Sequence, residues 1–409
     1  MKVLNFGSCN VDTVYMVKHI VQGGETLGVS SVEVFPGGKG LNQSIALARA
    51  GVKVYHAGCI GKEDSMLIPL MQKAQIDVTH LKKVDDKTGQ AIIQLDENGQ
   101  NAIMVHAGAN AAVTKEYIDE VLSFFKEGDF LLLQNEISNI LYLIEQASAK
   151  GMRIVLNPSP FTDELYKIDF NKLYCVILNE TEAMQWARVR KPYDFISFVN
   201  EHCRGLKVVL TLGGNGSIYL NNQDVYRQFA YKLPAIDTTA AGDTFTGYFV
   251  AGLFRGEDIK DVLKNASIAA ALAVSRKGAA ISIPMLAEVL EHADVLQPNI
   301  SENYTEQKEL IESYMMSNIA NIKLQDVANV LGYTPAHTSR WIRKNFGLSF
   351  SEFVQNERCE RAAELLEDSQ IPIGEVIYKV GYQNETFFRE MFMKKYNMSP
   401  RDYRKQKKS

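Results

Sequence analysis

Residues 237–254 have the sequence DTTAAGDTFTGYFVAGLF, in which small residues surround Asp243 and a helical apolar pattern begins directly after it. Ala-Ala-Gly at a helix start lets backbone N–H groups point into a tight concavity, where the helix dipole adds positive potential. Such a hollow suits a transferring phosphoryl group, and Asp243 would be placed to accept the proton of an attacking hydroxyl. An aspartate at a helix start is more often a simple N-terminal cap, so this stretch alone leaves both interpretations open.

A second glycine-rich stretch, PGGKGLNQS at residues 36–44, precedes the apolar run IALARAG. It lacks the Gly-x-x-x-x-Gly-Lys-Ser/Thr spacing with which a P-loop wraps phosphates, because no Ser or Thr follows Lys39. Its glycines still let the backbone approach a ligand closely, and Asn42 offers both a donor and an acceptor. The stretch therefore predicts a ligand-binding loop that does not hold a nucleotide phosphate.

Around these two stretches, β-rich apolar runs alternate with helical patterns over residues 1–297. The expected strands are VLNF, VKVYHAG, FLLLQ, RIVLN, YCVILN and VVLTLGG, and the expected helices include NQSIALARAG, SNILYLIEQASAK and ETEAMQWARV. This alternation predicts an α/β domain around a mostly parallel sheet, with ligands at the carboxyl ends of its strands. Residues 90–106 carry two apolar runs separated by ENGQ, which predicts a hairpin.

The composition indicates a cytoplasmic protein of more than one domain. The chain has 409 residues, 46% of them hydrophobic and 22% charged, with no apolar run of membrane-spanning length and no recognisable signal peptide. Its five cysteines have no ligand spacing, so we expect reduced and mostly buried thiols. Residues 321–409 carry 15 Lys and Arg against 11 Asp and Glu, whereas the rest carries 29 against 37. A basic tail on an acidic body makes nucleic acid a candidate partner of the tail.

The two glycine-rich stretches, taken together and in this order, resemble the two signature motifs of the ribokinase (PfkB) family of sugar kinases. Further blocks extend the resemblance over residues 1–295: GSCNVD, GETLGVSSVEVFPGGKG, VHAGANAAVT, NETEA, TLGGNG and SRKGAAISIP. The resemblance implies a ribokinase-like α/β fold with a small β lid. It also implies phosphoryl transfer from ATP, with Mg²⁺, to a free pentose, above all ribose.

The resemblance assigns roles on both sides of the transfer. Sugar contacts are implied for Asn10, Asp12, Gly37, Gly38, Lys39, Asn42 and Glu136. Asp243 matches the general base, and Ala240, Ala241 and Gly242 match the anion hole. Nucleotide contacts are implied for Asn179, Glu182, Thr211, Gly213, Gly214, Gly216, Gly242 and Ser267, the first two of them near the phosphates and Mg²⁺.

A monovalent-cation site for K⁺ is implied beside the anion hole. Its ligands, mostly backbone carbonyls, would come from Asp237, Thr239, Ala273, Arg276, Gly278 and Ser282. The chain departs from the family at two positions. Ala240 stands where many members have glycine, a change we expect activity to survive. Ser267 stands where ribokinases tend to have asparagine near the adenine, which bears on the details of nucleotide contact.

The tail begins with a polar segment, residues 298–310, which predicts a linker. Beyond it lies an internal repeat, in which LGYTPAHTSRWIRKNFGLS at residues 331–349 aligns with VGYQNETFFREMFMKKYNMS at residues 380–399. Gly332 aligns with Gly381, and Asn397 takes the place of Gly347 at an expected left-handed position. A helix, a glycine turn and a second helix form the helix-turn-helix pattern, whose second helix enters the DNA major groove.

Two such units, joined by SEFVQNERCERAAELLEDS and ending in YNMSPRDYRK, resemble the DNA-binding domain of the AraC/XylS transcription regulators. The resemblance implies double-stranded DNA as a partner. Recognition-helix contacts are implied for Ala336, His337, Thr338, Arg340, Gln383, Asn384, Glu385, Thr386 and Arg389. Phosphate contacts, which position the protein without specifying sequence, are implied for Arg343, Lys344, Lys394, Lys395 and Arg404.

We therefore expect a kinase domain at residues 1–297, a linker at 298–310 and an AraC-type domain at 311–409. The expected function is an ATP-dependent sugar kinase fused to a sequence-specific transcription regulator, dimeric through the kinase lid. Two alternatives stay open: a sugar-sensing regulator with little or no turnover, and a kinase for deoxyribose, a nucleoside or a fructose phosphate. A regulator without turnover has no need of a base, so the presence of Asp243 argues against the first alternative. Asn10, Asp12 and Glu136 together favour a free polyhydroxy sugar over the second.

Overall fold

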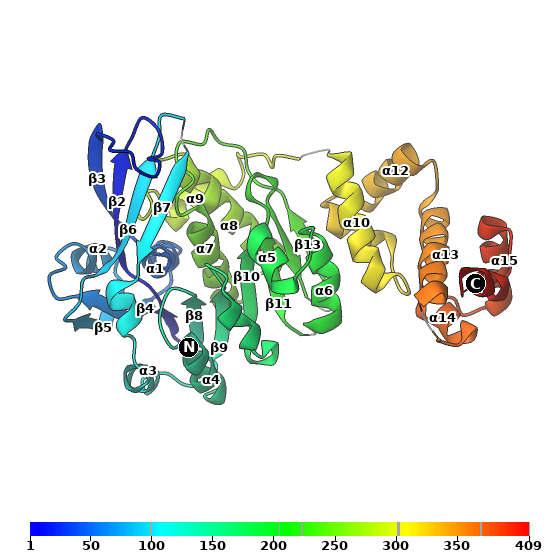
Figure 1. Cartoon of the computed structure of the whole chain (residues 1–409), viewed down its shortest axis with the longest axis horizontal. Helices are drawn as coiled ribbons and strands as arrows, with labels where there is room; N and C mark the ends of the chain where they lie inside the picture. The colour runs from blue at the N-terminus through cyan, green and yellow to red at the C-terminus, as the bar shows by residue number, and fades with distance from the viewer. Residues whose placement is uncertain (99, 204, 222–223, 301–302, 369, 409) are drawn as a thin grey trace. The chain divides into compact units, whose positions relative to one another are not determined.

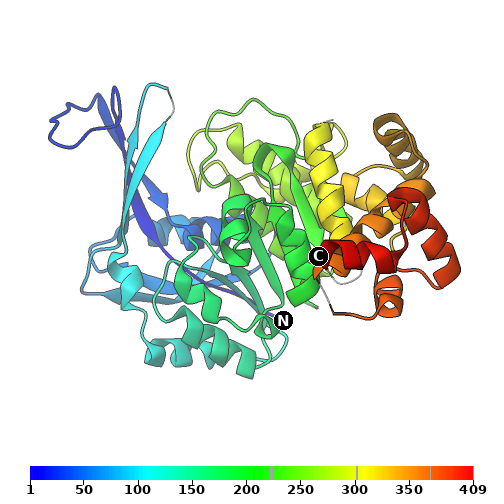
Figure 2. The same cartoon turned by 45° about the vertical axis from the view of Figure 1, so that its right-hand side comes forward.

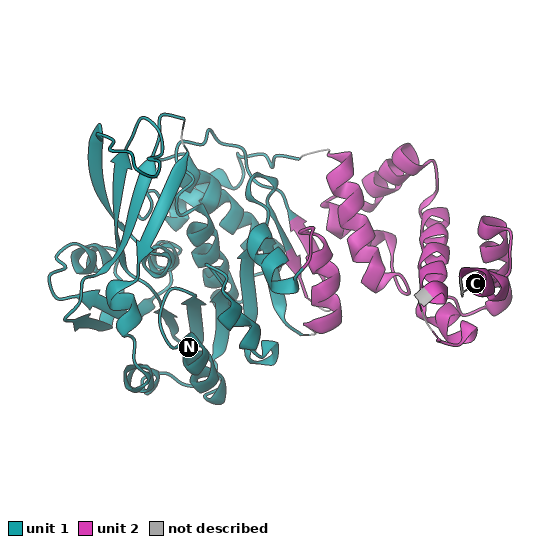
Figure 3. Ribbon diagram, viewed as in Figure 1, with its two compact units in different colours: residues 1–188, 205–218, 228–300 teal, residues 189–204, 219–227, 301–409 magenta. Residues whose placement is uncertain are grey.

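The computed structural model describes residues 1–98, 100–203, 205–221, 224–300, 303–368 and 370–408. The chain divides into two compact units (Figure 3). Unit 1 comprises residues 1–188, 205–218 and 228–300, and unit 2 comprises residues 189–204, 219–227 and 301–409. Two short segments of the N-terminal region thus group with the C-terminal helices, which the predicted boundaries did not anticipate. Over the described ranges, no helix is long and apolar enough to cross a membrane.

The large sheet has nine described strands in the order β13-β12-β11-β10-β9-β8-β1-β4-β5 (Figure 1). Their bounds are β1 Val3–Phe6, β4 Val54–Gly61, β5 Asp77–Val84, β8 Phe130–Gln134, β9 Arg153–Asn157, β10 Cys175–Asn179, β11 Lys207–Thr211, β12 Ser217–Leu220 and β13 Val225–Gln228. Pairing is parallel from β11 through β1 to β5. Strands β1 and β8 are buried at every residue, which explains why apolar residues predominate in both. The predicted α/β architecture is confirmed.

A small sheet in the order β3-β2-β6-β7 projects from the large one (Figure 2). It contains β2 Asn10–Met16, β3 Ser31–Gly37, β6 Gly89–Leu95 and β7 Asn101–His106. The predicted hairpin is present as the antiparallel pair β6–β7, although Gly99 of its turn lies outside the described residues. Because β2 begins four residues after β1 ends, the base of the small sheet lies at the carboxyl end of β1.

Nine helices of the described chain precede residue 300. They are α1 Lys39–Arg49, α2 Leu67–Lys73, α3 Lys115–Leu122, α4 Ile140–Ala149, α5 Glu180–Ala187, α6 Asp194–His202, α7 Ala241–Arg255, α8 Ile259–Val274 and α9 Leu286–His292. Helices α1 and α7 pack closely at Gly247, where an added Cβ would lie 2.3 Å from the Cβ of Ala46. Glycine at this position therefore allows the two helices that carry the signature motifs to approach each other.

The described part of the tail is helical throughout, as predicted. Its helices are α10 Tyr304–Asn318, α11 Leu324–Leu331, α12 Pro335–Phe346, α13 Phe350–Asp368, α14 Ile373–Lys379, α15 Glu385–Tyr396 and α16 Pro400–Lys408. Helix α10 begins at Tyr304, so the linker is shorter than the predicted residues 298–310. The four repeat positions are left-handed as expected, with φ of 70° at Gly332, 89° at Gly381, 71° at Gly347 and 52° at Asn397.

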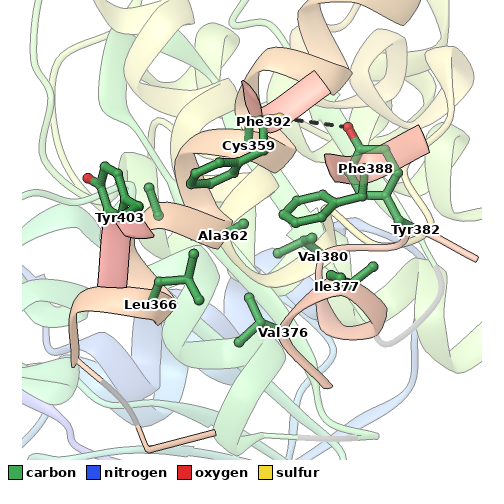
Figure 4. Packing of buried hydrophobic residues seen from close by; sticks show 11 residues of the cluster. Cys359, Ala362, Leu366, Val376, Ile377, Val380, Tyr382, Phe388, Phe392 and Tyr403 are labelled. Carbon is green, nitrogen blue, oxygen red and sulfur yellow. Dashed lines mark hydrogen bonds between the residues drawn. The ribbon is translucent and has the colours of Figure 1, made fainter. Parts of the chain in front are cut away.

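The second helix-turn-helix unit has its own apolar core (Figure 4). Phe388 and Phe392 of α15 are fully buried against Leu366 of α13 and against Val376 and Ile377 of α14. Burial of large apolar side chains of this kind contributes about 1.5–3 kcal/mol each. The repeated helix pair is thus held together by packing between elements rather than by helix propensity alone.

Two glycines of the repeat should respond differently to alanine. At Gly381 an added Cβ would lie 2.3 Å from the carbonyl oxygen of Ala320, whereas at Gly347 it would meet nothing within 4 Å. We expect Gly347→Ala to cost about 1–2 kcal/mol through its left-handed φ alone. Gly381→Ala should cost roughly 3 kcal/mol or more, because the backbone must also move. Hydrogen exchange of α12 and α13 measures the cost at Gly347, and that of α14 and α15 the cost at Gly381; equal costs would contradict the clash.

Candidate active site and nucleic-acid interface

Asp243 lies in the first turn of α7 and is held by two side chains of α1. Asn42 Nδ2 donates to Asp243 Oδ2 at 3.0 Å, and Gln43 Nε2 donates to Oδ1 at 2.9 Å. The N-cap of α7 is Ala240, with no side-chain cap bond, so Asp243 does not cap the helix. Its carboxylate is 8% exposed and fixed in orientation, and each oxygen keeps a second lone pair for an incoming proton.

Gln43, which the sequence interpretation overlooked, belongs to a buried chain of amides behind Asp243. Gln134 Nε2 donates to Gln43 Oε1 at 2.7 Å and to Asn5 Oδ1 at 3.0 Å, while Gln43 Nε2 also donates to Asn157 Oδ1 at 3.0 Å. The chain spans α1, β1, β8 and β9, so it ties the carboxylate to the centre of the sheet. The available signal was the polar run at residues 42–44, where the helix is buried.

The residues predicted to bind sugar gather where β1 leads into β2. Asn10 is 5% exposed, and its Oδ1 accepts from Asn110 Nδ2 at 2.8 Å. Asn110 is a second residue that the sequence interpretation did not single out. Gly38 has φ 95°, and a Cβ there would lie 2.9 Å from the backbone nitrogen of Asn10, so only glycine lets the loop approach β2.

The carboxylates on this side are organised around Lys39. Glu136 Oε2 accepts the hydroxyl hydrogen of Ser8 and the backbone N–H of Lys39, the latter at 3.2 Å. Two buried acceptors, Asp12 Oδ1 and Asn42 Oδ1, have no partner within the described structure. Leaving such an atom unpaired costs about 1–3 kcal/mol, so these oxygens suit hydroxyl donors of a bound ligand.

Charge and burial shift several pKa values here. Burial, followed by the neighbouring Glu136 and Asp243, raises the pKa of Asp12 to about 7. Burial also raises the pKa of Glu136. For Lys39, burial acts to lower the pKa, but the carboxylates of Asp243, Glu136 and Glu182 outweigh it and raise the pKa. Lys39 therefore stays a cation among three carboxylates.

The raised pKa of Asp12 predicts a pH dependence. Below about pH 7 the carboxyl is mostly protonated and loses acceptor capacity for a ligand hydroxyl, so kcat/KM for the acceptor should fall as pH decreases through that value. Asp12→Asn should lower kcat/KM by roughly tenfold, the effect of about one lost hydrogen bond, and should flatten the profile. Initial rates at saturating ATP between pH 5.5 and 8.5 test this. An unchanged inflection in the variant would assign it to another group.

A cavity of about 550 Å³ lies on the other side of Asp243. It is lined by the predicted nucleotide residues Asn179, Thr211, Gly213, Gly214, Gly216, Gly242 and Ser267, by Ala241 of the predicted anion hole, and by apolar residues including Leu233, Phe245, Ala270 and Val274. Ser267 is 6% exposed, and its Oγ has no partner within the described structure. Apolar walls with a few polar atoms are the usual lining of a small-molecule site.

Glu182, which was also predicted to contact the nucleotide, does not line this cavity. Its carboxylate accepts the backbone N–H of Asn179 at 3.0 Å, while Asn179 Oδ1 accepts the N–H of Glu182 at 2.9 Å. The two residues form a capping box at the start of α5, and only Asn179 lines the cavity. The Asn-x-x-Glu pair therefore has a structural role beside the phosphate role that the resemblance implies.

The departure at Ala240 falls on a strained position. Ala240 has φ 60°, in the left-handed region, where a residue other than glycine costs about 1–2 kcal/mol. The backbone N–H of Ala241 donates to Thr238 O at 3.3 Å, which leaves the amides of Gly242 and Asp243 as the first-turn donors. Of the three predicted anion-hole residues, Ala241 thus already has a hydrogen-bond acceptor within the protein.

The two segments of the predicted cation site lie together. Asp237 Oδ1 accepts from the N–H of Thr239 and Oδ2 from the N–H of Gly278, both at 2.9 Å. Burial would raise the pKa of Asp237, but these hydrogen bonds lower it. Because both carboxylate oxygens are already bonded, a cation here would rest mainly on carbonyl oxygens. One of them, that of Ala273, accepts a turn hydrogen bond from Arg276 at 3.2 Å.

Most residues predicted to contact DNA are exposed on two helices of unit 2. On α12, His337, Arg340, Trp341 and Lys344 line a hollow of about 260 Å³, and Ala336 and Arg343 are exposed. Gln383, Asn384, Glu385 and Thr386 are exposed around the start of α15, and Arg389 is exposed one turn into the helix. Asn384 also caps α15 by accepting the N–H of Phe387 at 3.0 Å.

Three of the residues predicted to contact DNA have partners within the protein, and for one of them the prediction is wrong. Thr338 is fully buried, and its hydroxyl donates to Thr334 O at 3.0 Å, so the contact with bases is wrong. Arg404 Nη2 donates to Ile371 O at 2.7 Å, and Lys395 Nζ donates to Asn356 O at 2.9 Å. Both cations hold helices together through these bonds, and their part in phosphate contact stays a prediction.

Comparison with known proteins places both regions in families. Residues 1–286 match the sequence profile of "pfkB family carbohydrate kinase", and residues 327–406 match that of "Helix-turn-helix domain". A ribokinase of Staphylococcus aureus is 36% identical over 302 residues, covering 70% of this chain and 98% of that protein. The crystal structure of a Cryptococcus neoformans ribokinase in complex with ADP is 32% identical with a TM-score of 0.64, over 71% of this chain and 99% of that one. A deoxyribokinase of Salmonella typhi is 27% identical over 303 residues, covering 71% of this chain and 98% of that protein.

Proposed function

Because the chain belongs to the pfkB family of carbohydrate kinases and continues into a helix-turn-helix domain, we propose that it is a ribokinase that also binds DNA as a transcription regulator. The observation that carries the kinase half is the buried Asp243 carboxylate, oriented by Asn42 and Gln43 next to the cavity lined by Gly242. Relatives named ribokinase at 32–36% identity support ribose over deoxyribose, whose named kinase is 27% identical.

In the proposed reaction, a hydroxyl of the sugar donates to Asp243. As its oxygen attacks the γ-phosphorus in line, the proton passes to the carboxylate, the bond to the bridging oxygen breaks and ADP leaves. The amides of Gly242 and Asp243 stabilise the charge that develops on the transferred group. Lys39, kept protonated by three carboxylates, supplies further positive potential beside the attacking hydroxyl.

The proposed cofactors fit the donors present. Mg²⁺ bound with ATP would neutralise phosphate charge, and Asn179 and Glu182 would lie near this ion. Among the described residues no three His, Cys, Asp or Glu side chains form a metal group, so the ion would depend largely on phosphate oxygens. For K⁺, the carbonyls around Asp237, Ala273 and Gly278 would supply the oxygen ligands, next to the start of α7.

A homodimer through the small sheet is part of the proposal. Its strands expose large apolar side chains, with exposed fractions of 49–64% at Val32, Val34, Ile103, Met104 and Val105. A cluster of exposed apolar side chains on one element is typical of an interaction surface. A dimer would present two DNA-binding units to a repeated DNA site.

The kinase proposal is tested by ADP release with ribose, deoxyribose, nucleosides and fructose phosphates. We expect the highest kcat/KM with ribose. Asp243→Asn should lower kcat by about 10²–10⁴-fold, because the general base is lost. Asp261→Asn, an exposed acidic residue in the first turn of α8, is the matched control and should keep full activity. If no acceptor is turned over, the sugar-sensing regulator becomes the better description.

The DNA-binding proposal is tested with a duplex that the full-length protein selects from a random pool. Arg340 is exposed on α12, and Arg340→Ala should weaken binding by about 1–3 kcal/mol and relax preference at one base pair. Thr338→Val, at the neighbouring buried position, should leave base preference unchanged. Titrations at one fixed salt concentration give both affinities. A pool without enriched sequences, or a larger change in preference for the buried variant, would contradict the assignment.

A further inference from the structure

One residue of the nucleotide cavity lies beyond the end of the family profile match. Asn299 lines the cavity, although the match to the pfkB family ends at residue 286. Its backbone N–H donates to Ala230 O at 2.7 Å, and Pro298 forms an antiparallel bridge with Tyr231. Ala230 and Tyr231 line the same cavity. The segment that leaves the kinase region therefore adds a short edge to the nucleotide site.

That segment leads directly into α10, which is firmly held within unit 2. Asn303 caps the helix, and Glu306 pairs with Arg227 at 2.6 Å, with side chains 10% and 0% exposed. Glu306 also accepts the hydroxyl of Tyr193 at 2.7 Å. Removal of one partner of a buried charge pair strongly destabilises a protein, because the other charge stays buried without compensation. The pair therefore holds α10 against Arg227 of strand β13.

Helix α10 in turn contacts the first helix-turn-helix unit. It packs on α11, and Gln307 Nε2 donates to the hydroxyl of Tyr333, which follows the turn glycine Gly332. Two chain segments thus lead from the cavity to α10. One is residues 298–300, which precede α10 in the sequence. The other is Ala230, which lies three residues after Arg227, the partner of Glu306.

We propose that Pro298–Ile300 is part of the nucleotide site, that Asn299 contacts the bound adenine nucleotide, and that nucleotide occupancy thereby changes the DNA affinity of unit 2 through α10. The Asn299 amide offers both a donor and an acceptor, which suits a base edge or a ribose hydroxyl. A ligand that bonds Asn299 favours the arrangements of residues 298–300 in which the amide reaches it, and α10 follows this segment in the sequence. This inference rests on the proposed function for the identity of the nucleotide.

Calorimetric titration of ADP into the full-length protein tests the contact. Asn299→Ala removes the side chain but keeps the backbone bond to Ala230, and should weaken ADP binding about three- to tenfold. The KM for sugar should stay unchanged. Gln297→Ala, at an exposed position two residues earlier, is the matched control and should bind ADP as the wild type does. ADP affinity of Asn299→Ala within twofold of the wild type would overturn the contact.

The coupling is tested by the affinity of the wild type for its selected duplex with and without saturating ADP. We expect a change of about threefold or more, and by reciprocity the duplex must change ADP affinity by the same factor. Asn299→Ala should reduce this factor, and Arg227→Met with Glu306→Leu, which removes both charges together, should abolish it while ADP still binds. Equal DNA affinity with and without bound ADP would overturn the coupling alone. Failure of the wild type to bind ADP would overturn the kinase proposal as well.

Discussion

The hydrogen bonds from Asn42 and Gln43 to Asp243 are the constraint on which the rest of the site depends. They join helices α1 and α7, and the bonded residues lie 201 positions apart in the chain for Asn42 and 200 for Gln43. The bonds require α1 and α7 to approach closely, and Gly247 provides the space against Ala46. The fixed Asp243 carboxylate then lies between the predicted sugar-binding residues at β2 and the nucleotide cavity at Gly242. A displacement of either helix would separate the base from both of its substrates.

Features encoded by local sequence were predictable. Strands such as β8, the hairpin β6–β7 and the left-handed positions at Gly332 and Asn397 follow from residue type and spacing, and the structure has them. The role of Asp243 was ambiguous locally, because a cap and a base occupy the same turn. Gln43 and Asn299 were missed since their partners, Asp243 and Ala230, are brought near only by tertiary packing.

The errors in the predicted DNA face have a similar origin. Thr338 shares a helical face with Trp341 and Ile342, both buried, and a polar residue there hydrogen-bonds to its own helix. Arg404 was assigned by its charge, but its guanidinium satisfies a carbonyl at Ile371. Charge and family position indicate which helix meets DNA. They do not decide which side chains of that helix remain exposed after the helices have packed.

The site carries several unfavourable features that folding alone does not relieve. Asp12, Asn42 and Ser267 each bury an acceptor that has no partner among the described residues, and Ala240 occupies a left-handed conformation. These costs lie on both ligand sides, so bound sugar and nucleotide would satisfy groups that the free protein leaves unpaired. Ligand binding would then stabilise one arrangement of the cavity walls. Because Asn299 lines that cavity, the same stabilisation would extend to the segment that precedes α10 in the sequence.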